Sequence, residues 1–277
     1  MIRVTRARLM SRLWSLGGAW RGAARPTSIQ HSLTKGEAYE PEMYELFRQA
    51  LRPGMVVVDV GAHEGLFTHL AAALVGPTGR VWAFEPAPAN FRVLKRRASP
   101  FPQVTAVRAA LSDRNGLGRL AVDRDNSTRH SLFTANVGRR WRSWPVRMMT
   151  LGQALPADLK RLDLVKIDAQ GAEPQILLGA RSVIKRYHPL IAFELWPNGW
   201  RTGGHDPVAV LDSLKRLGYT LSYLSIRRGV LPEAAIQEFI QTTTRRWNSI
   251  NVLAVHRKST ARLESPTPRG RSMEEVL

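Results

Sequence analysis

The segment Val58-Asp59-Val60-Gly61-Ala62-His63-Glu64-Gly65 decides how this chain folds. It completes a short run of β-branched residues, 55–60, which we expect to form a buried strand. Gly61 permits a tight turn where the chain leaves the sheet, and Gly65 allows close packing where a helix over residues 66–75 begins. The N-terminus of that helix offers free backbone N–H groups to an anionic ligand.

Strand and helix patterns alternate along the rest of the chain. Beyond 55–60, we expect strands at residues 79–84, 104–111, 146–150, 162–167, 190–195, 219–225 and 250–256, and helices at 41–51, 66–75, 89–98, 173–187 and 207–217. Strands separated by helices need crossover connections, so the sequence predicts an α/β fold with a mainly parallel sheet. Two final strands without a predicted helix between them allow the last strand to be antiparallel.

Composition limits the possible classes of protein. Of the 277 residues 44% are hydrophobic, as in ordinary globular proteins, and the chain is long enough for one sizeable α/β domain. No apolar run approaches the roughly 18 residues of a membrane-spanning helix. Because the chain contains no cysteine, disulfides, thiol catalysis and thiolate zinc sites are excluded. We expect a cytoplasmic location.

The chain is strongly basic. Forty-one Lys and Arg against 22 Asp and Glu give a formal charge of +19, which favours anionic partners. The excess is concentrated in residues 1–25, with six arginines and no carboxylate, and in residues 114–147, with eight arginines. The alternative is that an arginine-rich composition reflects the base composition of the genome alone.

The ends of the chain differ from its middle. Leu9, Leu13 and Leu16 recur at helical spacing among arginines, a pattern typical of a helix that contacts a membrane surface. The alternative, which we rank first, is a loosely ordered leader. We expect a basic leader over residues 1–36, a domain over 37–256 with a basic insertion at 114–147, and a disordered tail over 257–277.

The ends of the first two strands indicate a nucleoside ligand. Glu85 ends the second strand, and a carboxylate in that position can accept two hydrogen bonds from a ribose diol. His63 stands where a dinucleotide site has a second glycine. Its side chain obstructs a pyrophosphate but is compatible with the methionine end of S-adenosylmethionine. The alternative is that the glycines serve packing only.

These residues resemble the FkbM-type methyltransferases. The resemblance covers residues 55–196 and rests on residues 58–65 and on Val81-Trp82-Ala83-Phe84-Glu85-Pro86, Ala110-Leu111-Ser112-Asp113 and Leu164-Val165-Lys166-Ile167-Asp168-Ala169-Gln170-Gly171-Ala172-Glu173. It implies a Rossmann-like class I methyltransferase fold, with a mainly parallel seven-stranded sheet and helices on both faces. It also implies transfer of a methyl group from S-adenosylmethionine, commonly to a hydroxyl of a sugar or a polyketide-like product.

The resemblance also implies which residues bind the cofactor. Asp59 and Gly61 match the part that holds the methionine, Glu85 the ribose-binding acid, and Ser112 and Asp113 the adenine contacts. With the neighbouring loop residues and the acid at the methyl-transfer site, the predicted set is Asp59, Gly61, His63, Gly65, Glu85, Ser112, Asp113 and Asp168.

Two positions depart from the family pattern. Gly152 replaces the usual acid of a Thr-Leu-Asp sequence, and Gln170 replaces a usual Glu. If either acid takes part in catalysis, activity is altered or lost here; if both are structural, little changes.

A hydroxyl acceptor benefits from a general base. The candidates are Asp168, Glu173, Glu194 and His205, of which we select Asp168, Glu194 and His205 as the catalytic residues. The alternatives are that Asp168 caps the following helix, that His205 is an exposed loop histidine and that Asp206 is a cap before Pro207. Asp168 and Glu194 carry oxygens suited to magnesium, but without a tight His/Asp cluster we assign no metal.

The insertion is expected to bind the acceptor or to pad the sheet edge as a hairpin. Phe133, Trp141 and Trp144 lie among its arginines, a combination suited to a sugar bearing acid groups or to a nucleic acid. We favour an O-methyltransferase for a glycan or small molecule. A nucleic-acid methyltransferase is supported by charge only, because the Asn-Pro-Pro-Tyr-type signature is absent. A non-catalytic cofactor-binding homologue is the third interpretation, and nothing in the sequence indicates an oligomeric state.

Overall fold

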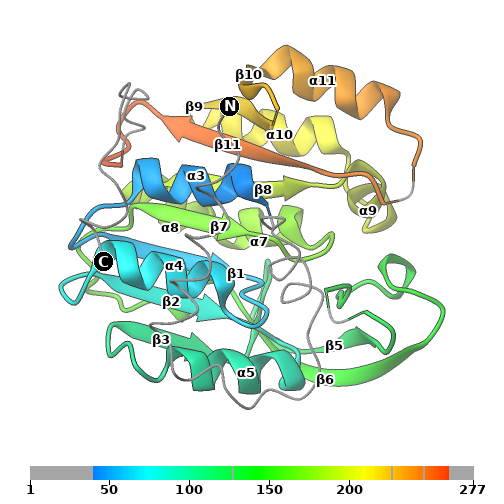
Figure 1. Ribbon diagram of the computed structural model, residues 1–277. Coiled ribbons are helices and arrows are strands. Elements are labelled where there is room, and N and C mark those ends of the chain that lie inside the picture. Colours follow the sequence, from blue (N-terminus) through cyan, green and yellow to red (C-terminus); the bar gives the residue numbers. More distant parts are fainter. Residues whose placement is uncertain (1–39, 127, 226, 246, 262–277) are drawn as a thin grey trace, which may run out of the picture. The chain divides into compact units, whose positions relative to one another are not determined.

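The computed structural model describes residues 40–126, 128–225, 227–245 and 247–261. The expected leader over residues 1–36 and residues 262–277 of the expected tail lie outside the described residues. An eight-stranded sheet in the order β10-β9-β11-β8-β7-β1-β2-β3 forms the centre of the fold (Figure 1).

Five strands of this sheet are parallel: β1 (Val56–Val60), β2 (Arg80–Phe84), β3 (Val104–Val107), β7 (Leu164–Ile167) and β8 (Leu190–Leu195). The other three are β9 (Tyr219–Ser225), β10 (Gly229–Pro232) and β11 (Ile250–His256), and β11 runs antiparallel to both β8 and β9. β1 lies between β2 and β7 with all five residues buried, as a valine-rich strand covered on both faces requires.

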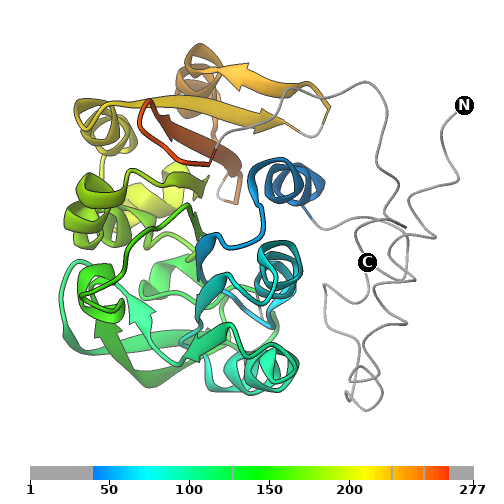
Figure 2. The same cartoon turned by 90° about the vertical axis from the view of Figure 1, so that its left-hand side faces the viewer.

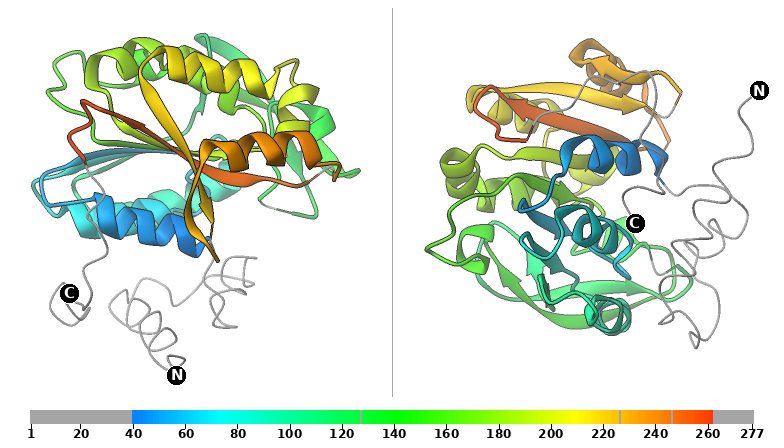
Figure 3. Two further views of the ribbon diagram at one scale, coloured as in Figure 1. Left: turned by 90° about the horizontal axis from the view of Figure 1, so that it is seen from above. Right: turned by 60° about the vertical axis from the view of Figure 1, so that its left-hand side comes forward.

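Helices cover both faces of the sheet (Figures 2 and 3). One face carries α3 (Pro41–Ala50), α4 (Leu66–Val75) and α5 (Pro88–Ala98), and the other carries α7 (Glu173–Gly179), α8 (Arg181–Tyr187) and α10 (Pro207–Arg216). The remaining helices are α6 (Leu151–Ala154), α9 (Pro197–Thr202) and α11 (Glu233–Thr242). The helices that cover the sheet turn their apolar sides toward it. In α3, for example, the buried residues Met43, Leu46, Phe47 and Ala50 follow helical spacing.

The basic insertion forms most of a second, three-stranded sheet in the order β4-β6-β5. Its strands are β4 (Ala110–Leu111), β5 (Gly116–Asp123) and β6 (Trp141–Met149), and a short 3-10 helix, η2 (Thr134–Asn136), lies between β5 and β6. Leu120, Val146 and Met148 form a small core of their own. The hairpin lies at the end of the main sheet where the parallel strands terminate, on the right of Figure 1.

The structure confirms the predicted fold class. It adds one strand to the expected seven, because β10 pairs with β9 at the sheet edge, and it places α11 between the last two long strands. The last strand is antiparallel. The expected strand at 104–111 divides into β3 and β4, which belong to different sheets.

Two boundaries also differ from expectation. The helix expected over residues 173–187 divides at Ala180, next to Gly179, whose missing side chain allows the carbonyl of Ser112 to approach. The described fold continues past residue 256, because Ser259 and Ala261 are buried and the Ser259 hydroxyl donates to the carbonyl of His188. Within the described residues, none of the helices combines the length and apolarity needed to span a bilayer.

We predict that Gly61→Ala destabilises the fold by at least about 2 kcal/mol. Gly61 has φ +72°, and a Cβ there would lie 1.8 Å from the carbonyl oxygen of Asp168. Gly229→Ala is the control, because Gly229 has φ +73°, close to that of Gly61, but nothing within 4 Å of the added Cβ. Comparing the thermal unfolding of the two variants isolates the effect of the close approach between Gly61 and the carbonyl of Asp168. Equal losses of stability would show that this close approach is unimportant.

Candidate cofactor and active site

The turn after β1 brings the ends of two parallel strands together. Gly61, His63 and Gly65 all have left-handed backbone conformations, with φ of 72°, 52° and 91°. A side chain at Gly61 would overlap the Asp168 carbonyl, and one at Gly65 would press on Leu94. Gly61 is therefore required by packing against backbone, and Gly65 by its left-handed backbone conformation, whatever the turn binds.

Glu85 lies at the end of β2 and points at this turn. Its carboxylate is buried and accepts hydrogen bonds from the backbone N–H groups of His63 and Ala87, both at 2.9 Å. Burial raises the pKa of Glu85 to about 7. The ends of β1 and β2 thus meet at one carboxylate, which is the geometry expected of a ribose-binding acid.

A buried row of three charges connects this turn to the end of β7. Asp59 is fully buried, and its Oδ2 accepts a hydrogen bond from the Thr68 hydroxyl at 2.6 Å. The Nζ of Lys166, also buried, lies 4.0 Å from Oδ1 of Asp59 and 3.6 Å from Oδ2 of Asp168. Burial raises the pKa of Asp59, and the Lys166 charge opposes that shift. Sequence reasoning missed Lys166, although a lysine inside an otherwise apolar strand was a signal.

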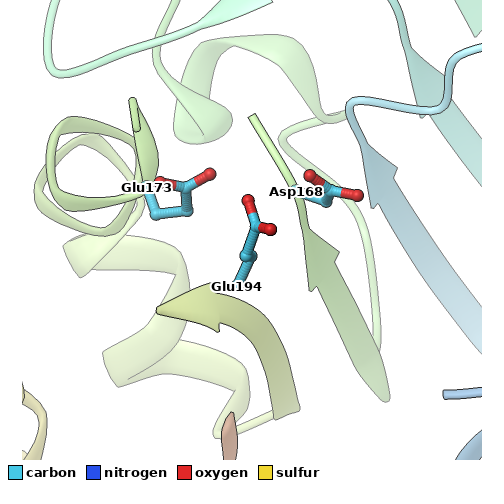
Figure 4. A group of neighbouring side chains, drawn as sticks. All are labelled: Asp168, Glu173 and Glu194. Carbon is cyan, nitrogen blue, oxygen red and sulfur yellow. The ribbon is translucent and has the colours of Figure 1, made fainter. Parts of the chain in front are cut away.

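Three carboxylates gather where β7 and β8 end (Figure 4). Asp168, Glu173 and Glu194 each offer an oxygen within 4.8 Å of the others, and the Glu194 carboxylate lies between the other two. Nε2 of Gln170 donates to Oδ1 of Asp168 at 3.1 Å and to Oε2 of Glu194 at 3.3 Å. The Ser249 hydroxyl donates to Oε1 of Glu194 at 2.7 Å. The site therefore contains a pair of carboxylates held by one amide group.

Glu173 has a different position from the other two acids. It is completely buried and accepts hydrogen bonds from the backbone N–H groups of Ala169 at 2.7 Å and Gly171 at 3.0 Å, and from the indole N–H of Trp200 at 2.8 Å. Burial raises the pKa of Glu173 to about 7. These contacts make Glu173 the anchor of the loop over residues 169–171, and they leave it poorly placed to reach an acceptor.

The acid cluster is tighter than the sequence indicated, and its three oxygens are close enough to surround a cation. Glu194 and Asp168 accept N–H and O–H hydrogen bonds from Gln170 and Ser249, and Glu173 accepts three N–H donors. Such donors stabilise carboxylates, and they also occur around carboxylates that bind a metal. The absence of a metal from this site therefore stays a prediction.

Ser112 and Asp113 contact other parts of the fold. The Ser112 N–H donates to the Met149 carbonyl, its hydroxyl donates to Asp113, and its carbonyl packs on Gly179. Asp113 also pairs with Arg114 at 3.3 Å. Among the described contacts, none joins these residues to the turn after β1. Their contact with adenine stays a prediction.

His205 and Asp206 follow α9. The backbone N–H of His205 donates to the Trp200 carbonyl, and the ring Nε2 is buried without a hydrogen-bond partner among the described residues. No described contact joins His205 to Asp168 or Glu194, so its role as a base stays a prediction. Asp206 caps α10 through the N–H groups of Val208 and Ala209.

The basic insertion reaches the acid cluster through Gln170. The carbonyl of Gln170, a residue with φ 52°, accepts hydrogen bonds from the Ser131 hydroxyl at 2.7 Å and from Nδ2 of Asn136 at 3.4 Å. Asn136 also donates to the Gly199 carbonyl at 3.2 Å. Of the two departures from the family pattern, Gln170 thus lies in the site. Gly152 faces Ser182 on α8, a helix contact.

Comparison with known proteins gives the family. The family model described as the methyltransferase FkbM domain matches residues 59–221, which span β1 to β9. This chain belongs to the FkbM methyltransferase family. The cofactor of this FkbM methyltransferase is accordingly S-adenosylmethionine. The buried Oδ1 of Asp59, which has no hydrogen-bond partner among the described residues, and the pairing of acid and turn at Glu85 fit such a ligand.

One relative is a much longer protein, the AMB antimetabolite synthetase AmbE of Pseudomonas aeruginosa. This chain is 30% identical to it over 235 residues, and the match covers 71% of this chain but 11% of that protein. A solved FkbM methyltransferase from Methylobacillus flagellatus has 17% identity and a TM-score of 0.43, with 89% of this chain and 59% of that chain covered. A methyltransferase from Aquifex aeolicus has 13% identity and a TM-score of 0.44, with 88% and 97% covered.

We predict that two buried acids make a contribution to stability that decreases as the pH rises from about 4.5 to about 7. The pKa of each of these carboxyl groups, Glu85 and Glu173, rises from 4.5 to about 7 on folding, so both hold their protons more tightly in the folded chain. Their contribution is complete below pH 4.5 and is lost as the pH rises to about 7, whereas the lowered pKa values of His69, His130 and His256 act in the opposite direction. Glu85→Gln removes one of the two acids, so its stability should fall less, or rise more, than that of wild type between these pH values.

Urea unfolding at several pH values measures this slope. Glu45→Gln, at an exposed position on α3, is the control and should follow wild type. An unchanged slope in Glu85→Gln would contradict the prediction.

Proposed function

We propose that this FkbM methyltransferase transfers a methyl group from S-adenosylmethionine to a hydroxyl group of a sugar, a glycan or a small natural product. The observation that carries the proposal is the carboxylate pair of Asp168 and Glu194, joined by Gln170. This pair lies directly beyond Gly61, because the carbonyl of Asp168 packs against that glycine. A base and a cofactor turn are therefore adjacent at one edge of the sheet.

Several residues fit the two ends of the cofactor. The Glu85 carboxylate accepts two backbone N–H groups and a hydrogen bond from the Asn90 side chain, which leaves capacity on the carboxylate for a ribose hydroxyl. The turn at residues 61–65 and the buried Asp59 would hold the methionine end. Lys166 balances the negative charge of Asp59 on the protein side.

The reaction asks the chain for positioning and for a proton acceptor. Bound S-adenosylmethionine supplies a methyl group on a positively charged sulfur. Asp168 would accept the proton that the acceptor hydroxyl loses when the acceptor oxygen takes the methyl group, the methyl–sulfur bond breaking to leave a neutral thioether. Glu194 orients the same hydroxyl, and the Gln170 amide holds both carboxylates in place. The ammonium group of Lys166 lies 3.6 Å from Oδ2 of Asp168 and helps to position that carboxylate.

A nucleic acid is the second candidate acceptor. Trp141 and Trp144 are 39% and 46% exposed on β6, among exposed arginines such as Arg142. Exposed aromatic and basic side chains are the elements of a single-strand binding surface. A radiolabelled methyl assay against glycans, sugars and RNA separates the two classes. Label that RNase removes would replace our proposal with the second one.

We predict that Glu85→Ala weakens binding of S-adenosylmethionine by about 1–3 kcal/mol, because a charged acceptor of ribose hydrogen bonds is lost. Isothermal calorimetry on the folded variant measures the dissociation constant. Glu45→Ala, at an exposed position on α3, should bind like wild type. An unchanged constant in Glu85→Ala would rule out the ribose role.

We predict that Asp168→Asn lowers turnover about 100-fold or more while cofactor affinity changes little, because a general base is lost. Methyl transfer and calorimetry on the same preparation measure the two quantities. Asp212→Asn, which removes a surface carboxylate paired with Lys215 on α10, is the control. Wild-type turnover in Asp168→Asn would end the assignment of the base.

A further inference from the structure

One arginine of the basic insertion differs from its neighbours. The guanidinium of Arg129 lies 4.8 Å from the centre of the Trp247 ring, and Arg129 is half-buried. Arg140, in contrast, pairs with Asp125, and Arg119 donates to the Ser143 hydroxyl. Within the described residues, no carboxylate and no other acceptor bonds to the Arg129 guanidinium. It is a positioned cation whose N–H donors are unused there.

An aromatic stack holds this cation. Trp247 stacks on Trp196, with ring centres 4.9 Å apart and an angle of 27° between the planes. A guanidinium over an indole is held by its charge and by contact between flat surfaces, while its N–H groups point outward in its own plane. Trp196 is buried, so the stack has a fixed base.

Both ends of the stack are tied to the acid cluster. Trp196 follows β8 directly, two residues after Glu194, and Ser249, two residues after Trp247, donates to Glu194. On the other side, Ser131, two residues after Arg129, donates to the Gln170 carbonyl. Three segments of the chain therefore link the Arg129–Trp247–Trp196 stack to the carboxylate pair, each through a residue two positions from a member of the stack.

Among the contacts of the described residues, none joins this cation to Asp168 or Glu194. Glu194 accepts hydrogen bonds from Ser249 and Gln170, and the ion pair of Asp168 is with Lys166. We propose that Arg129, held by Trp247, binds the anionic group of the methyl acceptor, a carboxylate or a phosphate. This inference rests on the proposed function, and it narrows the acceptor to an acidic sugar or a similar acidic hydroxyl compound.

The test uses the full chain and three related sugars. All three have the same type of sugar ring. Glucose carries no anionic group, glucuronate carries a carboxylate, and glucose 6-phosphate carries a phosphate. Calorimetric titration should show that wild type binds at least one acidic sugar about tenfold or more tightly than glucose, as expected for a charged hydrogen bond. The preferred acid identifies the source of the anionic group. Arg129→Gln should abolish the preference while its melting temperature stays close to wild type.

Arg142→Gln is the matched control, because it removes an exposed arginine from the same insertion and leaves the stack intact. It should keep the preference. An equal loss in both variants would assign the effect to overall charge, and a wild type without any preference would equally overturn the inference. The titration needs no turnover. Acid preference without cofactor binding or methyl transfer would therefore sink the proposed function and leave the anion site standing.

Discussion

The buried contact of Lys166 with Asp59 and Asp168 is the constraint on which the rest of the site depends. An ammonium group in the centre of a sheet is costly unless carboxylates surround it, and Asp59 is the register partner of Lys166 on the neighbouring strand. Removing Lys166 would leave the completely buried Asp59 without its counter-charge. The row therefore fixes how β1 and β7 end, and with them the turn at Gly61 and the acid beyond it.

The acid cluster is assembled around one residue, Gln170. Its amide group joins Asp168 to Glu194, while its carbonyl receives the insertion through Ser131 and Asn136. An amide can donate to both carboxylates, whereas an ionised acid in its place would repel them unless a proton or cation intervened. The replacement of the usual Glu thus does not by itself indicate lost activity. It indicates that this chain holds its two acids by hydrogen bonds.

The sequence predicted the sheet, the turn at Gly61 and the acid at Glu85 because these follow from local patterns: β-branched runs, glycines and strand ends. It did not predict the contacts that assemble the cluster. Ser249 and Gln170 meet at Glu194 only because β11 returns antiparallel beside β8, and no local pattern contains that information. The division of residues 104–111 between two sheets had the same cause, since the partner of β4 is the distant β6.

The basic insertion has two possible roles, binding the acceptor or padding the sheet edge, and its charge alone does not favour either of them. As a hairpin with its own small core, it has the form of an element that pads the sheet edge. Its connection between β5 and β6, however, brings Ser131 and Asn136 to Gln170 and Arg129 to Trp247, contacts that lie outside that core. The positions of these residues, rather than the number of arginines, favour a role in acceptor binding. A general electrostatic attraction would need no aromatic stack to hold a single guanidinium, and Trp247 and Trp196 form such a stack with Arg129.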